Sequence, residues 1–509
     1  MKAILILVDS VCRRLLSCYG SAEPAYTPNL DRLAAKGTVF ENHWCGSAPC
    51  MPARRDLMTG RLNFLEKPWG AIEPYDLPLP KLLGRAGVFS HIVTDHYHYI
   101  RVGGENYLNA FSTYDLIRGQ EKDPWQLHPR ADGSFPSRPD SYLGQFSPHH
   151  EDNMALFQEE TSYPTPVTMT RAADWLEQNA KADQFFLWVE GFDPHEPFDV
   201  PQKYLDLYRD EAEVDENEPN YWPPYEPNTY TPEETRHIRI RYKALLSMTD
   251  AYIGKILDVM DREDLWKDTV VIFTADHGYM LGEHGYWSKN YMPAYNEVFH
   301  IPLLVWHPES TVRRFSGLTQ NIDVYPTLAN VFGADLNEVP VPVTGKDLMP
   351  ALRGEAESLR DEIIYGYFGK SVNYTDGRYT YFRAAADPSN RPLNVYTAMP
   401  STAGKYYGLD SIDPADYTKI GFGKLEYTDY PVYRIPAEIV QITASSGGFG
   451  PRSADNAESM LFDLRSDYAQ EHPLSDRETE DRCIEGLIRC MKKNSAPEEQ
   501  FARLGLPLS

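Results

Sequence analysis

The chain has 509 residues, of which 42% are hydrophobic and 13% aromatic, so it can bury a large core and form more than one structural unit. This composition excludes a disordered chain as the main state. The formal charge of -25 at pH 7 argues against nucleic acid as a partner, and it means that an anionic substrate must be met by locally concentrated positive charge.

The chain begins with a short apolar run, Ile4–Val8, which ends at Asp9. The run is too short for the core of a signal peptide or for a membrane span, so it predicts a buried strand. Provided that Met1 is the native start, we expect a cytoplasmic protein without membrane attachment. Six cysteines in so long a chain, without a Cys-x-x-Cys pair, favour neither a disulfide scaffold nor structural zinc.

The next informative segment, Cys50–Arg61, carries a cysteine four residues before Arg54, where a helix is expected to start. Pro52 suits the opening of a helix, because an N–H group is not needed there. A thiol or thiol-derived group at a helix N-terminus also feels the positive end of the helix dipole. The segment therefore predicts an anion site around Cys50 and Arg54.

Apolar runs alternate with helical patterns further along the chain. Besides Ile4–Val8, the clearest strands are Phe185–Val189, Val270–Thr274 and Leu303–Trp306, and Leu245–Met260 has the spacing of a helix. This alternation predicts an α/β fold with a large, mostly parallel central sheet that is flanked by helices.

Polar side chains follow three of these strands directly. Asp9 follows the first, Asp193 and His195 follow the second, and Asp276 and His277 follow the third. Because ligands bind beyond the carboxyl ends of strands in open α/β sheets, we expect these side chains to converge. Carboxylates suit calcium, magnesium or manganese, and a single imidazole favours manganese among them.

Two long stretches, 101–160 and 201–234, are rich in proline, tyrosine and acidic residues and predict loops or insertions over the site. After residue 360 the pattern changes to short aromatic and β-branched runs, followed by a helix around Glu478–Met491. We therefore expect a catalytic α/β domain over 1–360 and a smaller C-terminal α+β subdomain with an antiparallel sheet over 361–509.

The motif Cys-x-Pro-x-Arg at 50–54, followed by Leu-x-Thr-Gly-Arg at 57–61, resembles the signature of the type I sulfatases within the alkaline phosphatase superfamily. The usual motif has serine where this chain has Ala53. The resemblance covers most of the chain, because Thr27–Asp31, Asn321–Leu328 and Leu461–Leu464 follow in the order of the family. It implies that a maturation enzyme oxidises Cys50 to formylglycine.

The resemblance also implies a metal site and a set of catalytic side chains. One divalent ion, calcium or manganese, would be held by Asp9, Cys50, Asp276 and His277. Arg54 and Lys289 would neutralise the transferred anion, and His195, between two prolines, would pass a proton to the leaving alcohol.

Two departures from the usual family pattern indicate a divergent member. The first is Asp9–Ser10, where the family commonly has two consecutive carboxylates. A single carboxylate there, combined with Asp276–His277, is similar to choline sulfatases and to phosphonate monoester hydrolases. Loss of one anionic ligand weakens a calcium site unless another group replaces it.

The second departure is Thr94–Tyr99, where the family usually shows Gly-Lys-x-His. Either Asp95 and Tyr97 take the lysine and histidine positions, or His96 and His98 do their work after a shift of one residue. Because alternate residues of an extended segment face one way, we expect His96 and His98 to face the pocket as catalytic residues.

The resemblance implies hydrolysis of a sulfate ester of a small molecule or carbohydrate. A hydrated formylglycine attacks sulfur, the alcohol leaves, and the aldehyde forms again as sulfate departs. One alternative is a phosphonate monoester or phosphodiester hydrolase with the same apparatus. A second is a noncatalytic binding protein in which Cys50 is not matured. The oligomeric state stays open, with a homo-oligomer among the alternatives.

Overall fold

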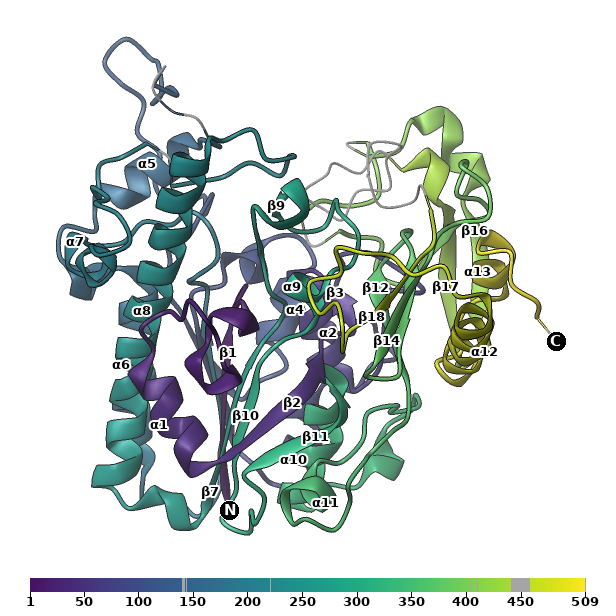
Figure 1. The fold of residues 1–509 in the computed structure, drawn as a ribbon, viewed down its shortest axis with the longest axis horizontal. Helices are drawn as coiled ribbons and strands as arrows, with labels where there is room; N and C mark the ends of the chain where they lie inside the picture. The colour runs from purple at the N-terminus through teal and green to yellow at the C-terminus, as the bar shows by residue number, and fades with distance from the viewer. Residues whose placement is uncertain are drawn as a thin grey trace.

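Eight strands form one large sheet in the order β11-β2-β10-β7-β1-β6-β4-β5 (Figure 1). The computed structural model describes residues 1–139, 142, 144–219, 221–402, 404–409, 411–440 and 458–508. The strands of the large sheet are β1 (Lys2–Val8), β2 (Thr38–Trp44), β4 (Ser90–Thr94), β5 (Thr113–Leu116), β6 (Phe186–Gly191), β7 (Thr269–Ala275), β10 (Leu303–Trp306) and β11 (Arg314–Gln320).

The central strand β1 lies parallel between β6 and β7, with Leu5 opposite Trp188 and Ile272. β4 and β5 continue the parallel order beyond β6, and β11 is parallel to β2. Only β10, among the strands of this sheet that the structure describes, runs antiparallel to both of its neighbours. The prediction of an α/β fold with a mostly parallel sheet is confirmed, and all four predicted strands lie in this sheet.

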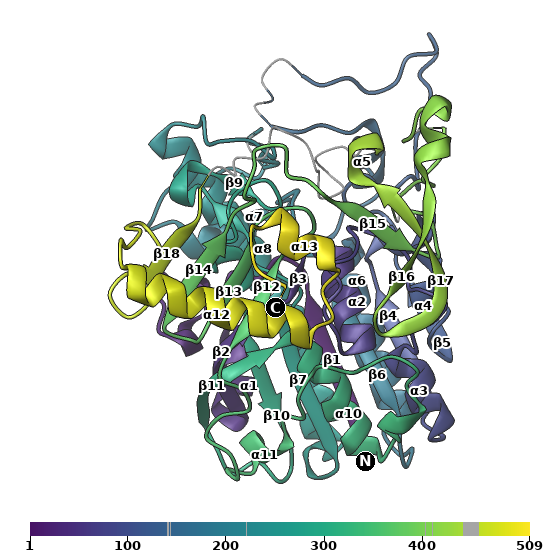
Figure 2. The same cartoon turned by 90° about the vertical axis from the view of Figure 1, so that its right-hand side faces the viewer.

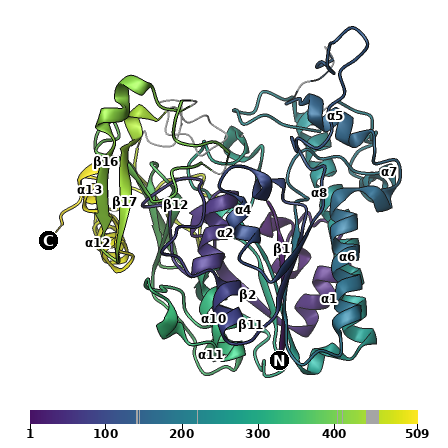
Figure 3. The ribbon, with the colours of Figure 1, turned by 180° about the vertical axis from the view of Figure 1, so that it is seen from behind.

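Helices cover both faces of the sheet, as the opposite views in Figures 1 and 3 show. Alternate residues of β1 enter two different cores: Ile4 and Ile6 pack in one, and Leu5 and Leu7 in the other. This double burial explains why β1 is apolar throughout. The first core contains α1 (Pro28–Lys36), α6 (Pro164–Asn179) and α8 (Pro232–Arg262), and the second contains α2 (Cys50–Thr59), α3 (Leu79–Arg85) and α10 (Val324–Phe332).

A second, five-stranded sheet lies beside the first in the order β18-β14-β13-β12-β3, and α12 (Arg477–Lys493) packs against it (Figure 2). Its C-terminal strands are antiparallel, as expected: β12 (Ile363–Tyr367), β13 (Val372–Thr375), β14 (Tyr379–Arg383) and β18 (Met460–Asp463). The remaining strand, β3 (Ser47–Ala48), comes from the N-terminal part of the chain and pairs with β12 directly before Cys50. The domain boundary at residue 360 stays a prediction.

Shorter elements fill the connections. A three-stranded sheet is formed by β15 (Asn394–Thr397), β17 (Thr428–Pro436) and β16 (Gly421–Leu425), and β8 (Met280–Leu281) pairs with β9 (Trp287–Ser288). The short helices are α4 (Glu105–Leu108), α5 (Pro148–Met154), α7 (Gln202–Leu205), α9 (Asn296–Phe299), α11 (Met349–Leu352) and α13 (Glu498–Arg503). No helix in the described ranges has both the length and the apolar character needed to cross a membrane.

Candidate active site

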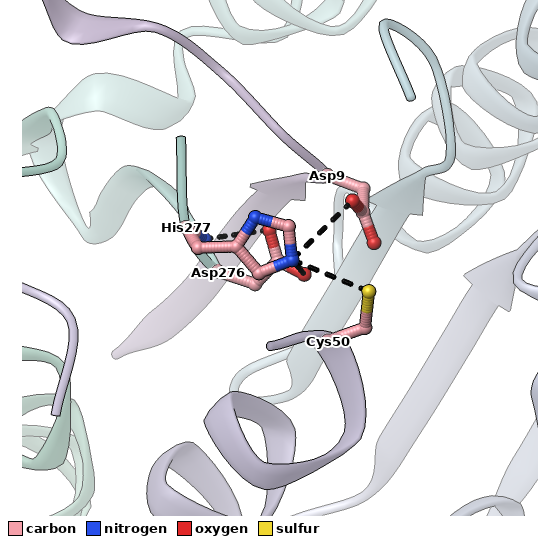
Figure 4. A group of neighbouring side chains, drawn as sticks. All are labelled: Asp9, Cys50, Asp276 and His277. Carbon is pink, nitrogen blue, oxygen red and sulfur yellow. Dashed lines mark hydrogen bonds and ion pairs between the residues drawn. The ribbon is translucent and has the colours of Figure 1, made fainter. Parts of the chain in front are cut away.

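Four side chains converge where β1 and β7 end and α2 begins (Figure 4). One ligand atom from each of Asp9, Cys50, Asp276 and His277 lies within 4.8 Å of the others, and all four residues are buried. The parallel pairing of β1 with β7, which sets Val8 opposite Ala275, brings Asp9 and Asp276 to the same edge of the sheet. These are the four residues that the sequence analysis expects to hold a metal.

Cys50 reaches this edge because it is the first residue of α2. The sequence analysis expects Pro52 to open the helix, but Pro52 lies within the first turn, where its missing N–H group removes no intrahelical hydrogen bond. Asp56 holds the preceding loop by accepting hydrogen bonds from the Ser47 backbone N–H at 2.7 Å and from its hydroxyl at 2.8 Å. The Cys50 Sγ atom lies 3.2 Å from Nε2 of His277.

The charge states of the converging carboxylates and imidazole suit a bound cation. Burial, and after it the nearby Asp9 carboxylate, raise the pKa of Asp276 to about 7. Burial and then Lys289 keep the pKa of His277 well below its usual value, so its imidazole is neutral. Its Nδ1 atom lies 2.8 Å from the Gly278 carbonyl oxygen, which leaves Nε2 for a ligand. Two carboxylates and a neutral imidazole fit a divalent cation.

The Cys50 thiol itself is poorly suited to attack. Burial, followed by the charge of Asp9, raises its pKa well above the ordinary value of a thiol. The thiolate is the reactive form of cysteine, so an unmodified Cys50 is a weak nucleophile at neutral pH.

The guanidinium of Arg54 contacts buried carboxylates next to the four converging side chains. Its Nη2 lies 3.0 Å from Asp9, its Nη1 2.5 Å from Asp276, and its Nε 2.7 Å from Glu190. All four side chains are fully buried. Arg54 therefore forms ion pairs with three carboxylates, and its contact with the transferred anion stays a prediction. Glu190 was not predicted, although a carboxylate that directly follows the apolar run Phe185–Val189 was a visible signal.

Lys289 approaches the group from the other side. Its Nζ donates a hydrogen bond to Ser10 Oγ at 2.8 Å and lies 3.6 Å from Asp9 Oδ1, and the Ser10 hydroxyl donates to Asp9 at 2.7 Å. Burial alone would lower the pKa of Lys289, but Cys50 and Asp9 raise it above its ordinary value, so the side chain stays charged. Ser10, which stands where a second carboxylate was expected, thus links Asp9 to Lys289.

A cavity of about 390 Å³ opens beside Cys50. Lys289, His195 and His98 line it together with Cys50. His195 follows β6, as predicted, whereas Asp193 is not part of the cavity lining and interacts with Gln120 at 3.1 Å.

The segment after β4 differs from its prediction. Tyr97–Ile100 forms a 3₁₀ turn, so the alternation of an extended strand does not apply there, and the catalytic roles of His96 and His98 stay a prediction. Tyr97 and His98 both line the cavity, whereas His96 lies below it, with Nδ1 3.9 Å from Asp9 and from Glu190. Asp95 points elsewhere and accepts hydrogen bonds from Gln120, Thr165 and the Phe192 backbone.

The sequence matches the family model described as Sulfatase over residues 2–334. The chain belongs to the sulfatase family. This sulfatase is 26% identical over 421 residues to the choline-sulfatase of Rhizobium meliloti (strain 1021), an alignment that covers 76% of this chain and 78% of its relative. The prediction of a member of the sulfatase family is thereby confirmed.

Solved structures share the fold of this sulfatase along nearly its whole length. The phosphonate monoester hydrolase of Agrobacterium radiobacter has a TM-score of 0.65 at 18% identity, covering 97% of this chain and 96% of its own. BT4656, solved with its substrate D-glucosamine-2-N,6-O-disulfate, has a TM-score of 0.63 at 15% identity and covers 98% of both chains. At these identities the likeness concerns the fold.

Proposed function

We propose that this sulfatase hydrolyses sulfate esters with a nucleophile that is derived from Cys50 by oxidation to formylglycine. The observation that carries the proposal is the meeting of Cys50 with Asp9, Asp276 and His277 within 4.8 Å at the start of α2. The high pKa of the buried Cys50 thiol adds support, because the unmodified side chain would attack poorly. Hydrated formylglycine would supply the attacking oxygen and a second hydroxyl for the release of sulfate.

The same four residues would hold one divalent cation, calcium or manganese. When bound, this cation would supply positive charge to the attacking oxygen and to the sulfuryl group. A neutral His277 whose Nε2 faces Cys50, beside two buried carboxylates, supports this assignment. A single imidazole among oxygen ligands favours manganese.

The remaining side chains have distinct tasks in the proposed reaction. Lys289 binds the sulfuryl oxygens as a charged group at the cavity wall, and Arg54 keeps Asp9 and Asp276 in place. His195 donates a proton to the leaving alcohol, and His98 binds the substrate on the same side of the cavity. His96 acts on substrate only through the carboxylates below it.

Mass analysis and turnover test this function together. In native protein, we expect the peptide that contains Cys50 to carry the lower mass of formylglycine, and 4-nitrophenyl sulfate to be hydrolysed. A protein with unmodified Cys50 is expected to be inactive. Turnover by material that contains only the thiol would contradict the proposal, whereas an unmodified Cys50 in inactive native material would favour a binding protein.

Phosphonate monoester or phosphodiester hydrolysis is the second candidate. The single carboxylate of Asp9–Ser10 and the structural likeness to the phosphonate monoester hydrolase of Agrobacterium radiobacter favour it. Comparing kcat/KM for an aryl sulfate, a phosphate diester and a phenyl phosphonate, each with calcium or manganese, separates the two. A strong preference for the phosphonate would overturn the assignment to sulfate.

We also propose a substrate class, a maturation partner and a location for this sulfatase. A small-molecule or carbohydrate sulfate ester suits a cavity of about 390 Å³ whose lining includes Trp69, Tyr225 and several charged side chains. A formylglycine-generating enzyme would be the required protein partner. The cytoplasm remains our proposed location.

A further inference from the structure

A buried carboxylate lies beside the ring of His195. Glu196 is 0% exposed, and its carboxylate has the Tyr279 hydroxyl as a hydrogen-bonding neighbour. Its Oε2 lies 3.3 Å from Nδ1 of His195. A buried carboxylate with so few hydrogen bonds is costly unless a positive charge compensates it. Glu196 therefore favours a charged partner at the position of this ring.

The His195 ring is held with one nitrogen on Glu196 and the other left free. Its Nδ1 lies 2.6 Å from the backbone oxygen of Glu196, so Nδ1 carries a proton and donates it to this carbonyl. The Phe192 ring packs against the imidazole with 4.2 Å between ring centroids, which further restricts its orientation. Because His195 also lines the cavity, Nε2 is the nitrogen that exchanges a proton with substrate.

Lys289 is the other cation in this neighbourhood and also interacts electrostatically with Glu196, but its ion-pair contact is with Asp9. It donates to Ser10 and lies 3.6 Å from Asp9, on the metal-binding side of the cavity. The Tyr279 side chain borders Glu196, and burial followed by the Glu196 charge raises the pKa of this phenol well above its usual value, so it stays neutral. His195 is thus the basic side chain that lies within ion-pair distance of Glu196 among the described residues.

We propose that Glu196 is a positioning residue for His195, which holds Nε2 toward the cavity and stabilises the protonated ring that passes its proton to the leaving alcohol. This inference rests on the proposed function. The proton moves from Nε2 to the ester oxygen as the bond between that oxygen and sulfur breaks. The ring recovers a proton when the second hydroxyl of the nucleophile loses its own and sulfate leaves.

The dependence of rate on the leaving group tests this role. Phenols that are acidic leave without a proton, whereas weakly acidic phenols need one. For Glu196→Gln, we expect kcat/KM to fall about 100-fold for the aryl sulfate of the least acidic phenol, and by less than about threefold for the most acidic one. His195→Ala should show the same gradient. The double variant should lose little more than either single variant, because both changes remove one function.

A second histidine–glutamate pair provides a matched control. Glu218 Oε2 lies 2.9 Å from Nδ1 of His237, in and beside the 201–234 insertion and outside the cavity lining. Glu218→Gln makes the same chemical change at that pair, and we expect it to leave the leaving-group dependence unaltered.

Two results would overturn the proposal. If Glu196→Gln lowers kcat/KM equally for all phenols, Glu196 acts through packing or through Lys289 and not through His195. If kcat/KM is unchanged, Glu196 has no role in the reaction. If Glu196→Gln does not fold, Glu196→Asp takes its place. A dependence of kcat/KM on the leaving phenol that is intermediate between those of wild type and His195→Ala supports the proposal. An equal loss for all phenols, or no loss, overturns it.

Failure of the proposed function gives a different result, since wild-type protein would then hydrolyse no aryl sulfate. In that case nitrogen NMR of labelled histidine decides the positioning. We expect a proton on Nδ1 of His195 and a changed signal in the Glu196→Gln or Glu196→Asp variant, and identical spectra would overturn the inference.

Discussion

The buried charge network next to the cavity, which we call the floor, and the rim of the cavity are built in opposite ways. The floor, Asp9, Arg54, Glu190 and Asp276, is fully buried at strand ends and a helix start, and each carboxylate is paired with Arg54. The rim includes Arg101 and Glu226, which are exposed and belong to the long stretches 101–160 and 201–234. The difference indicates that the reaction is set by rigid elements of the core, whereas the choice of alcohol depends on surface loops.

The largest expected effect comes from the residue that joins floor to cavity. Cys50→Ala should reduce aryl sulfate turnover at least about 10⁴-fold, because it removes the nucleophile. The cost in stability should be about 1 kcal/mol, since one small buried atom is lost. Cys45→Ala is the matched control, because Cys45 is equally buried but is not one of the converging group. Steady-state kinetics and chemical denaturation measure both quantities, and comparable losses of activity in the two variants would contradict the assignment.

A buried charge in the floor should matter for stability as much as for catalysis. Arg54→Ala leaves three buried carboxylates without their cation, and we expect the free energy of unfolding to fall by about 3–5 kcal/mol. Arg353→Ala, which breaks a solvent-screened pair with Glu309, should have a much smaller effect on stability. Urea denaturation of both variants checks the contrast. Equal losses would show that the buried network is no more important than a surface pair.

Removal of the metal should lower the activity and stability that depend on the buried floor, whereas the residues of the rim should be unaffected. Chelation should lower turnover at least about 100-fold, because the cation is proposed to neutralise charge in the reaction. It should also lower the melting temperature, because a ligand that binds only the folded state stabilises it. Elemental analysis, calorimetry and recovery with manganese or calcium provide the measurements. Full activity in protein verified to be free of metal would break the proposal.

The smallest effect is expected at the rim. Arg101→Ala should leave kcat for 4-nitrophenyl sulfate within about twofold and shift kcat/KM by up to about fivefold toward esters of cationic alcohols, because an exposed charge contributes little. The comparison uses one cationic and one anionic ester at equal ionic strength. A large, equal loss of kcat for every ester would assign Arg101 to the reacting machinery and remove the distinction between floor and rim.

The sequence predicted the chemistry of this protein better than its supporting contacts. Asp9, Asp276 and His277 directly follow apolar runs, so their positions at one sheet edge followed from local patterns and the α/β class. Cys50 was added to this group through the resemblance to the sulfatases. His96 and His98 show the limit of such patterns. A turn replaces the expected extended segment, and only His98 of the two lines the cavity.

By itself the sequence determined the sulfatase motif, the mostly parallel sheet and the four converging side chains, because strand ends and helix starts are marked by neighbouring residues. Only the tertiary structure decided that Arg54 binds three carboxylates, that Glu196 lies beside His195 within ion-pair distance, and that β3 joins the C-terminal sheet. The physical reason is that such contacts depend on strand order and on rotamers within a packed core, which local residue patterns do not specify.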